Sequence, residues 1–142
     1  MIFPDANLLL YAEDSLSMQH DAVCVWWDAV LSGTAQVNLS WPVINAFIRI
    51  STNPRIHEQP LLVEEAVMRV NSWLDQPCVS VVGPTEFHWG IFQTQIKEAG
   101  ASGNLIADAH LASLAIEHGC ILYSTDKDFA RFPSLRWINP IV

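Results

Sequence analysis

Acidic side chains at three widely separated places in the sequence are the residues best suited to carry chemistry. Asp5 follows a short apolar segment near the start of the chain, and Asp108 lies within an otherwise apolar stretch. Asp126 and Asp128 follow a third apolar segment. Clustered carboxylate oxygens suit Mg²⁺ or Mn²⁺ and do not suit zinc. An ion held in this way binds phosphoryl oxygens and activates water, which is the chemistry of phosphodiester hydrolysis.

Asp108 is the acid that is hardest to explain as an ordinary surface residue. The segment 104–118 predicts a helix in which His110, Ser113 and Glu117 recur at helical spacing and form a stripe facing solvent. At about 100° per residue, Asp108 projects to the opposite, inward side. An inward carboxylate is costly unless it is paired, hydrogen-bonded or bound to a metal. The alternative to a metal site is a structural ion pair.

Asp5 and Asp126 each come directly after a predicted strand. For either residue alone, an aspartate that caps a turn is an equally good explanation. The unit Asp126-Lys127-Asp128 is likewise typical of a solvated turn. The functional interpretation depends on the fold bringing Asp5, Asp108 and Asp126 together at one edge of a sheet.

The order of apolar segments predicts a fold that places these acids together. Strand-like and helix-like segments alternate, which favours an α/β domain with a mostly parallel sheet. Ligands of such sheets lie beyond the carboxyl ends of the strands, where Asp5 and Asp126 are expected. The predicted strands are 2–3, 35–39, 78–82, 120–125 and 137–138, and the predicted helices are 18–31, 41–53, 62–74, 85–99 and 104–118.

Length and composition indicate one folded domain over residues 1–142. Hydrophobic residues make up 51% of the 142-residue chain, too many for a disordered protein. No apolar run reaches the roughly 18–20 residues that a membrane-spanning helix needs. The N-terminus shows no secretion signal, so we expect a cytoplasmic protein. Three widely spaced cysteines, in apolar surroundings, predict reduced core thiols rather than disulfides or a zinc site.

The charge balance argues against a broad basic surface for nucleic acid. Seven Lys and Arg stand against fifteen Asp and Glu, a formal net charge of −8. A nucleic-acid enzyme remains possible if its acids hold a metal and its few basic residues act locally. Of the six tryptophans, Trp26, Trp27 and Trp73 are predicted to lie in the core, whereas Trp41 and Trp89 are open to a partner.

Three motifs together resemble the PIN domain, and most closely the VapC-type ribonuclease toxins of bacterial toxin–antitoxin pairs. They are Asp5-Ala6-Asn7 after the first strand, Asp108-Ala-His-Leu-Ala with Asn104 ahead of it, and Ser124-Thr-Asp-Lys-Asp-Phe129. The segments 40–55, 129–132 and 139–140 add further likeness. The resemblance covers essentially the whole chain, and the ordered set of acids is its specific part.

The resemblance implies a three-layer α/β/α sandwich and a Mg²⁺-dependent endoribonuclease of single-stranded RNA, with Mn²⁺ as a substitute ion. In such an enzyme Asp5, Asp108 and Asp126 surround the metal and Asp128 supports them. It also implies a cognate antitoxin protein, an RNA substrate and a homodimer, with no membrane association.

The sequence departs from the family pattern at position 45. Most PIN nucleases carry a Glu there, and this chain has Asn45. An amide oxygen can accept a hydrogen bond from a water on the metal but adds no charge, so one or two metals remain possible. Arg49, one turn further on the same helix face, is positioned for an RNA phosphate. Its alternative is a surface arginine paired with a nearby acid.

Two other functions fit parts of the sequence. The first is a PIN domain whose catalysis is weakened by Asn45 and which binds RNA or protein instead. The second is a phosphatase of the haloacid dehalogenase type, suggested by Asp126-x-Asp128 after a strand. That class requires its Asp-x-Asp on an early strand, and here the unit comes late.

Overall fold

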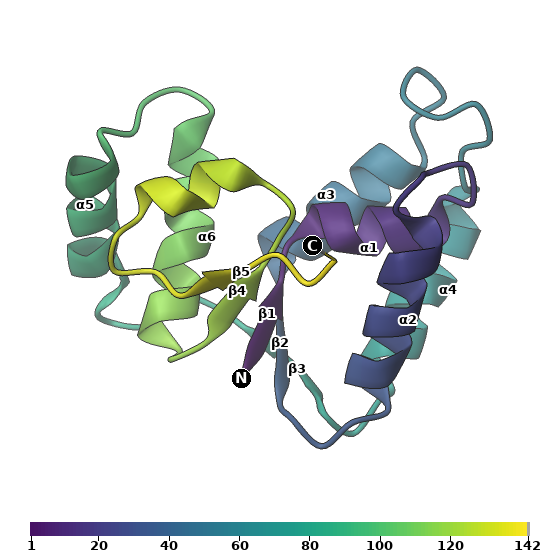
Figure 1. The fold of residues 1–142 in the computed structure, drawn as a ribbon, viewed down its shortest axis with the longest axis horizontal. Helices are drawn as coiled ribbons and strands as arrows, with labels where there is room; N and C mark the ends of the chain where they lie inside the picture. The colour runs from purple at the N-terminus through teal and green to yellow at the C-terminus, as the bar shows by residue number, and fades with distance from the viewer. Residues whose placement is uncertain (142) are drawn as a thin grey trace.

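A computed structural model describes residues 1–141, in which a five-stranded parallel sheet separates two groups of helices (Figure 1). The strands occur where the sequence predicts them, with ends that differ by at most two residues. They are β1 (Ile2–Pro4), β2 (Val37–Ser40), β3 (Val79–Val82), β4 (Ile121–Tyr123) and β5 (Trp137–Ile138). The order across the sheet is β3-β2-β1-β4-β5.

Helices cover both faces of the sheet. Those of the first half of the chain gather on one side: α1 (Ala6–Glu13), α2 (His20–Leu31), α3 (Trp41–Ser51) and α4 (Val63–Leu74) (Figure 1). On the other side lie α5 (His88–Ala99) and α6 (Leu105–Glu117). This arrangement confirms the expected α/β/α architecture. Within residues 1–141, no helix combines the length and apolar character needed to cross a membrane.

The strand order creates a switch point between β1 and β4. From β1 the chain proceeds outward through β2 to β3, and it then returns to the other side of β1 as β4. The two connections leave the carboxyl ends of β1 and β4 in opposite directions, so neither covers the space between them. In open α/β sheets, ligands bind at such a point. The predicted Asp5 and Asp126 follow these two strands.

The helix α1 was not among the predicted elements. Asp5 caps it, accepting a hydrogen bond from the backbone N–H of Ala6 at 2.7 Å. Leu8 and Leu9 are fully buried, so the apolar run is one side of a helix that follows the strand almost without a loop. Its start at residue 6 fixes Asp5 at the edge of the sheet.

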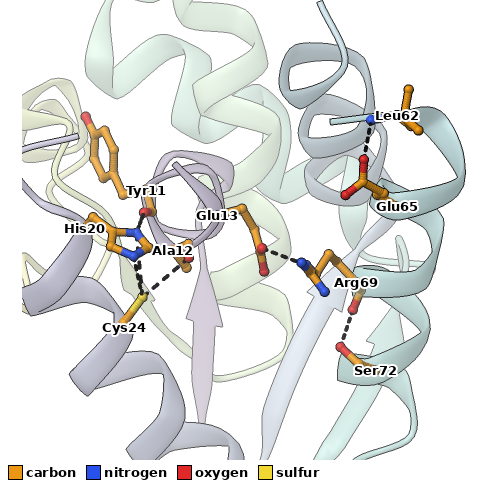
Figure 2. A network of polar contacts seen from close by, with 9 residues as sticks. All are labelled: Tyr11, Ala12, Glu13, His20, Cys24, Leu62, Glu65, Arg69 and Ser72. Atoms are coloured by element: carbon orange, nitrogen blue, oxygen red, sulfur yellow. Dashed lines mark hydrogen bonds and ion pairs between the residues drawn. The ribbon is translucent and has the colours of Figure 1, made fainter. Parts of the chain in front are cut away.

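Polar contacts hold the far end of α1 in place (Figure 2). Arg69 on α4 donates to the Glu13 carboxylate at 2.8 Å, and His20 Nδ1 lies 2.8 Å from the Tyr11 carbonyl oxygen. The thiol of Cys24 on α2 donates to the carbonyl of Ala12. Burial, and then nearby carboxylates, raise the pKa of Cys24, so this thiol stays protonated at neutral pH. The three cysteines are free, as predicted.

The prediction that His110, Ser113 and Glu117 face solvent is wrong. The helix α5 packs against this side of α6, and Ser113 is fully buried. The Glu117 carboxylate accepts from the backbone N–H of Thr85 at 2.6 Å and pairs with Nδ1 of His88. His110 Nδ1 lies 3.0 Å from the other ring nitrogen of His88. Helical spacing of polar residues indicates solvent only when no neighbouring helix supplies polar partners.

The predicted division of the tryptophans is confirmed. Trp27 and Trp73 are buried, and Trp26 is half-buried against the core. Trp41 and Trp89 are exposed.

Candidate active site

The four predicted acids lie at the carboxyl edge of the sheet and come from three elements. Asp5 lies between β1 and α1, and Asp126 caps the short 3₁₀ helix Lys127–Arg131 that follows β4. Asp128 lies in the first turn of that 3₁₀ helix, and Asp108 lies in the first turn of α6. The fold therefore brings together acids that are more than 100 residues apart in the chain.

Three of these acids are close enough to share one ion. One carboxylate oxygen from each of Asp108, Asp126 and Asp128 lies within 4.8 Å of the others. Asp108 and Asp126 are half-buried, and Asp128 is exposed. Asp5 is not a member of this closest set. Its Oδ1 accepts a hydrogen bond from the backbone N–H of Ala6, and its Oδ2 accepts one from Ser124.

Ser124 connects Asp5 to the turn that carries Asp126. Its hydroxyl donates to Asp5 Oδ2 at 2.7 Å and accepts from the backbone N–H of Asp126 at 3.0 Å. Asn7 also donates to this hydroxyl, at 3.2 Å, and to the hydroxyl of Thr125 at 2.9 Å. The fully buried Ser124 thus holds the ends of β1 and β4 in one arrangement.

The electrostatics of the cluster oppose its full ionisation. Burial and then the neighbouring charges of Asp126, Asp5 and Asp128 raise the pKa of Asp108 to about 6. Burial also raises the pKa of Asp5, and Asp126 contributes to the rise, while the hydrogen bonds from Ser124 and Ala6 oppose it. Like charges held this close are stabilised by a cation between them.

The residues present fit a divalent metal ion that prefers oxygen ligands. The three acids that converge are all aspartates. The amide oxygen of Asn7 beside them is buried and has no hydrogen-bond partner within residues 1–141, which leaves one more oxygen acceptor near the cluster. Such a donor set suits Mg²⁺ or Mn²⁺ and lacks the nitrogen and sulfur ligands typical of zinc.

A cavity of about 130 Å³ opens between α1, α3 and α6 beside the aspartates. It is lined by Asp5, Ala6, Pro42, Val43, Ala46, Ala107, Asp108 and Leu111. The helix α3 starts at this edge because Ser40 caps it and Pro42 occupies its first turn, both as predicted.

The two residues predicted on α3 lie beside this cavity rather than in its lining. Ala46 is the α3 side chain in the lining one turn beyond Pro42. Asn45 and Arg49 are exposed, and neither side chain makes a hydrogen bond within the described residues. The helix position turned toward Asp5 and Asp108 is therefore 46, where the small alanine adds no ligand.

Sequence reasoning assigned no role to Ser124, Asn7 or Ala46. A signal for the first two was present, because Ser124 comes directly after β4 and Asn7 comes shortly after β1. Polar side chains at the carboxyl ends of adjacent parallel strands meet at the same edge. For Ala46 there was no signal, since a one-residue difference in helix phase decides which side chain faces the cavity.

Without metal, replacement of Asp108 by asparagine is expected to stabilise the fold. Its folded pKa of about 6 exceeds the ordinary 3.8, so between these values the folded chain keeps a proton that the unfolded chain releases. The stability of wild type therefore falls as pH rises through this window. Above about pH 6, wild type has lost the full amount by which Asp108→Asn is more stable. Because the group is half-exposed, we expect a gain of about 1 kcal/mol, or ~3 °C in Tm.

Thermal melts in EDTA at pH 4 and pH 7.5 check this result. The advantage of Asp108→Asn over wild type should be present at pH 7.5 and nearly absent at pH 4. Glu58→Gln, an exposed loop acid, serves as the charge-matched control and should melt like wild type at both pH values. A lower Tm for Asp108→Asn at pH 7.5 would assign this carboxylate to a structural ion pair.

Comparison with known proteins gives a consistent match. The family model described as the PIN domain matches residues 2–135. The chain is 40% identical over 136 residues to ribonuclease VapC37 of Mycobacterium tuberculosis, covering 96% of this chain and 94% of that protein. It is 36% identical over 141 residues to ribonuclease VapC33 of the same species, covering 99% of both.

Solved structures match the fold over nearly the whole chain. VapBC2 from Rickettsia felis, bound to a DNA fragment from its promoter, gives a TM-score of 0.67 at 19% identity and 98% coverage of both chains. VapC20 of Mycobacterium tuberculosis, described as a toxin that cleaves the sarcin–ricin loop, gives a TM-score of 0.67 at 18% identity. That match covers 96% of this chain and 99% of the other.

Proposed function

The chain belongs to the PIN domain family, and from this premise we propose that it is a metal-dependent endoribonuclease of the VapC toxin type. The observation that carries the proposal is the convergence of carboxylate oxygens from Asp108, Asp126 and Asp128 within 4.8 Å of one another. The relatives that share 36–40% of its residues over nearly the full length are named ribonucleases. We propose that residues 1–142 form one such nuclease domain.

Each acid has a defined task in this proposal. Asp108, Asp126 and Asp128 hold the ion, and Asp5 adds its charge from a position fixed by Ser124. The chemistry that a bound divalent ion supplies is stabilisation of charge on phosphoryl oxygens and activation of water. The ion we propose is Mg²⁺, with Mn²⁺ able to replace it, because both prefer oxygen ligands.

The exposed side of α3 supplies the basic group that the cluster lacks. Arg49 is exposed beside the cavity and is positioned to bind a phosphate of the RNA near the scissile bond. Asn45, one turn before it, offers an amide to the same strand. Both contacts are local, which agrees with a chain whose net charge of −8 provides no broad basic surface.

The partners expected from the sequence belong to the same proposal. We propose a cognate antitoxin that places a basic side chain among the aspartates, since their like charges attract a cation. The helix α4 leaves Val63, Val67 and Met68 exposed, and apolar surface of this kind is typical of protein interfaces, including a homodimer. An enzyme that acts on cellular RNA works in the cytoplasm, which is the location we propose.

The two alternative functions, a phosphatase and a PIN domain that only binds, are not equally supported. The haloacid dehalogenase phosphatase requires another family, and the PIN domain match leaves it without support. A PIN domain that only binds RNA or protein shares the fold with our proposal. The absence of a carboxylate at both Asn45 and Ala46 is the observation that favours it.

The test is cleavage of RNA by the purified chain. We expect labelled single-stranded RNA to be cut with Mg²⁺ or Mn²⁺ and to remain intact in EDTA, because chelation removes the ion from the cluster. Gel analysis of the fragments, with metal added back after EDTA, separates this activity from contaminating nucleases that need no metal. A chain that binds the RNA but releases no fragments with either metal would establish the binding-only alternative.

A further inference from the structure

Trp41 is an exposed residue at the edge of the sheet that carries the aspartates. It is the first residue of α3 and comes directly after β2. Its chain neighbour Pro42 lines the cavity together with Asp5 and Ala6. Trp41 therefore lies at the rim of the cavity.

Packing explains the other tryptophans but not Trp41. Trp89 packs edge-on against Phe92 with ring centroids 6.0 Å apart, and Trp137 donates to the Ser124 carbonyl at 2.9 Å. The remaining three pack against aromatic neighbours: Trp26, Trp27 and Trp73. Trp41 is 61% exposed, and within residues 1–141 it has no aromatic neighbour and no acceptor for its indole N–H.

The tryptophan begins an exposed stripe on α3. Trp41, Asn45 and Arg49 follow one another every four residues, so they lie along one side of the helix, about 6 Å apart in rise. This side adjoins the side that lines the cavity through Pro42 and Ala46. An aromatic ring, an amide and a cation thus follow each other beside the side of α3 that lines the cavity.

The Arg49 guanidinium at the end of this stripe has no acidic partner within residues 1–141. Within residues 1–141, the ion pairs involve other residues, and no carboxylate lies within 4.0 Å of the Arg49 guanidinium. A free guanidinium beside a site for phosphodiester chemistry complements a phosphate. An exposed indole complements the face of a base. Phosphates and bases both occur at regular intervals along a nucleic-acid strand.

We propose that Trp41 stacks on an unpaired base of the RNA substrate while Arg49 binds a phosphate of the same strand. The exposed side of α3 then positions single-stranded RNA against the aspartate cluster. This inference rests on the proposed ribonuclease function and adds a positioning residue to it. Stacking tolerates any base but requires that its face is free, so Trp41 favours unpaired RNA over a duplex.

The test compares Trp41→Ala with Trp89→Ala, a tryptophan of similar exposure (65%) on α5. Steady-state cleavage in Mg²⁺ is measured on a labelled single-stranded RNA and on the same RNA annealed to its complement. We expect Trp41→Ala to raise KM for the single strand about tenfold with little change in kcat, because one stacked base is lost. The duplex should be unaffected, Trp41→Phe should retain most of the preference, and Trp89→Ala should behave like wild type.

Binding of the labelled single strand in an Asp108→Asn background, followed by fluorescence anisotropy, provides a readout without turnover. Equal binding and equal KM for Trp41→Ala and wild type would overturn the role of Trp41 while the ribonuclease function stands. Loss of self-association in sedimentation, with unchanged RNA binding, would assign Trp41 to a protein contact and equally overturn it. Failure of wild type to cut or bind RNA would overturn the proposed function itself.

Discussion

Replacing Asp108 by asparagine is expected to reduce metal-dependent RNA cleavage by at least ~10²-fold, because a metal ligand loses its charge while keeping its shape. Asp108 has the most strongly perturbed environment of the cluster, with a pKa raised to about 6 by burial and by three neighbouring carboxylates. Asp126→Asn and Asp128→Asn remove the charge of the other two acids of the closest set and should show losses of the same kind. The measurement is kcat/KM on a labelled RNA in Mg²⁺.

Asp5→Asn tests whether charge at the edge of the cluster matters as much as direct ligation. The asparagine retains one oxygen, which can accept either the hydrogen bond from Ser124 or the one from the backbone N–H of Ala6. We expect a loss of ~10²-fold here as well, because Asp5 contributes negative charge to the cluster that holds the ion. The control is Asp28→Asn, an exposed acid on α2, which should cleave like wild type. Substantial cleavage by Asp108→Asn would refute the assignment of the site.

Replacing Ser124 by alanine is expected to reduce cleavage about 10–100-fold, although Ser124 itself is not proposed to touch the metal or the RNA. The hydroxyl is fully buried, donates to Asp5, and accepts from Asp126 and Asn7. Its loss leaves one oxygen of the Asp5 carboxylate and the backbone N–H of Asp126 without this partner, which also costs about 1–3 kcal/mol of stability. The orientation of Asp5 and Asp126 is the property that the substitution disturbs.

Ser113→Ala is the matched control for this variant. Ser113 is also a fully buried serine, but its hydroxyl donates only to the carbonyl of Ala109 in its own helix. We expect Ser113→Ala to cleave like wild type and to unfold at nearly the same temperature. Cleavage kinetics and thermal melts of both variants give the result. Equal activity of Ser124→Ala and Ser113→Ala would show that the hydrogen bonds of Ser124 do not position the acids.

A positioning role also predicts which part of the kinetics changes. Ser124→Ala alters the arrangement of the groups around the reacting phosphate and should lower kcat, whereas Trp41→Ala should mainly raise KM. Trp41 lies on α3 and Ser124 directly follows β4, and the described residues show no hydrogen bond between them. Their effects on the activation free energy are therefore expected to add in the double variant, so that the fold-changes in kcat/KM multiply.

The sequence by itself determined the strands and the place of the acids along the chain. Short apolar runs bounded by turn residues predict strands, and the acids Asp5 and Asp126 follow two of them directly. In a parallel sheet the carboxyl ends meet at one edge, so local order in the chain already implies a shared location. Asp108 could be identified because a carboxylate in an apolar helix costs free energy unless it is paired, hydrogen-bonded or bound to a metal.

Only the tertiary structure decided which side of each helix faces which partner. The stripe of His110, Ser113 and Glu117 has the spacing of a solvent-facing side, yet α5 covers it and supplies His88 as a polar partner. Similarly, the sequence analysis placed the departure from the family pattern at Asn45, but the phase of α3 turns Ala46 into the cavity. Spacing defines a side of a helix, whereas what lies against that side depends on long-range packing.

For the same reason, the acids could be identified from the sequence, whereas the residues that position them could not. Aspartates stand out in a sequence because of their charge, but Ser124 resembles any serine after a strand. Its role arises when the switch point brings the end of β4 beside the end of β1, 119 residues away, where Asp5 accepts its hydrogen bond. The sequence therefore determined the chemical groups of the site, and the strand order β3-β2-β1-β4-β5 decided their geometry, because hydrogen bonds between distant segments exist only after the sheet has formed.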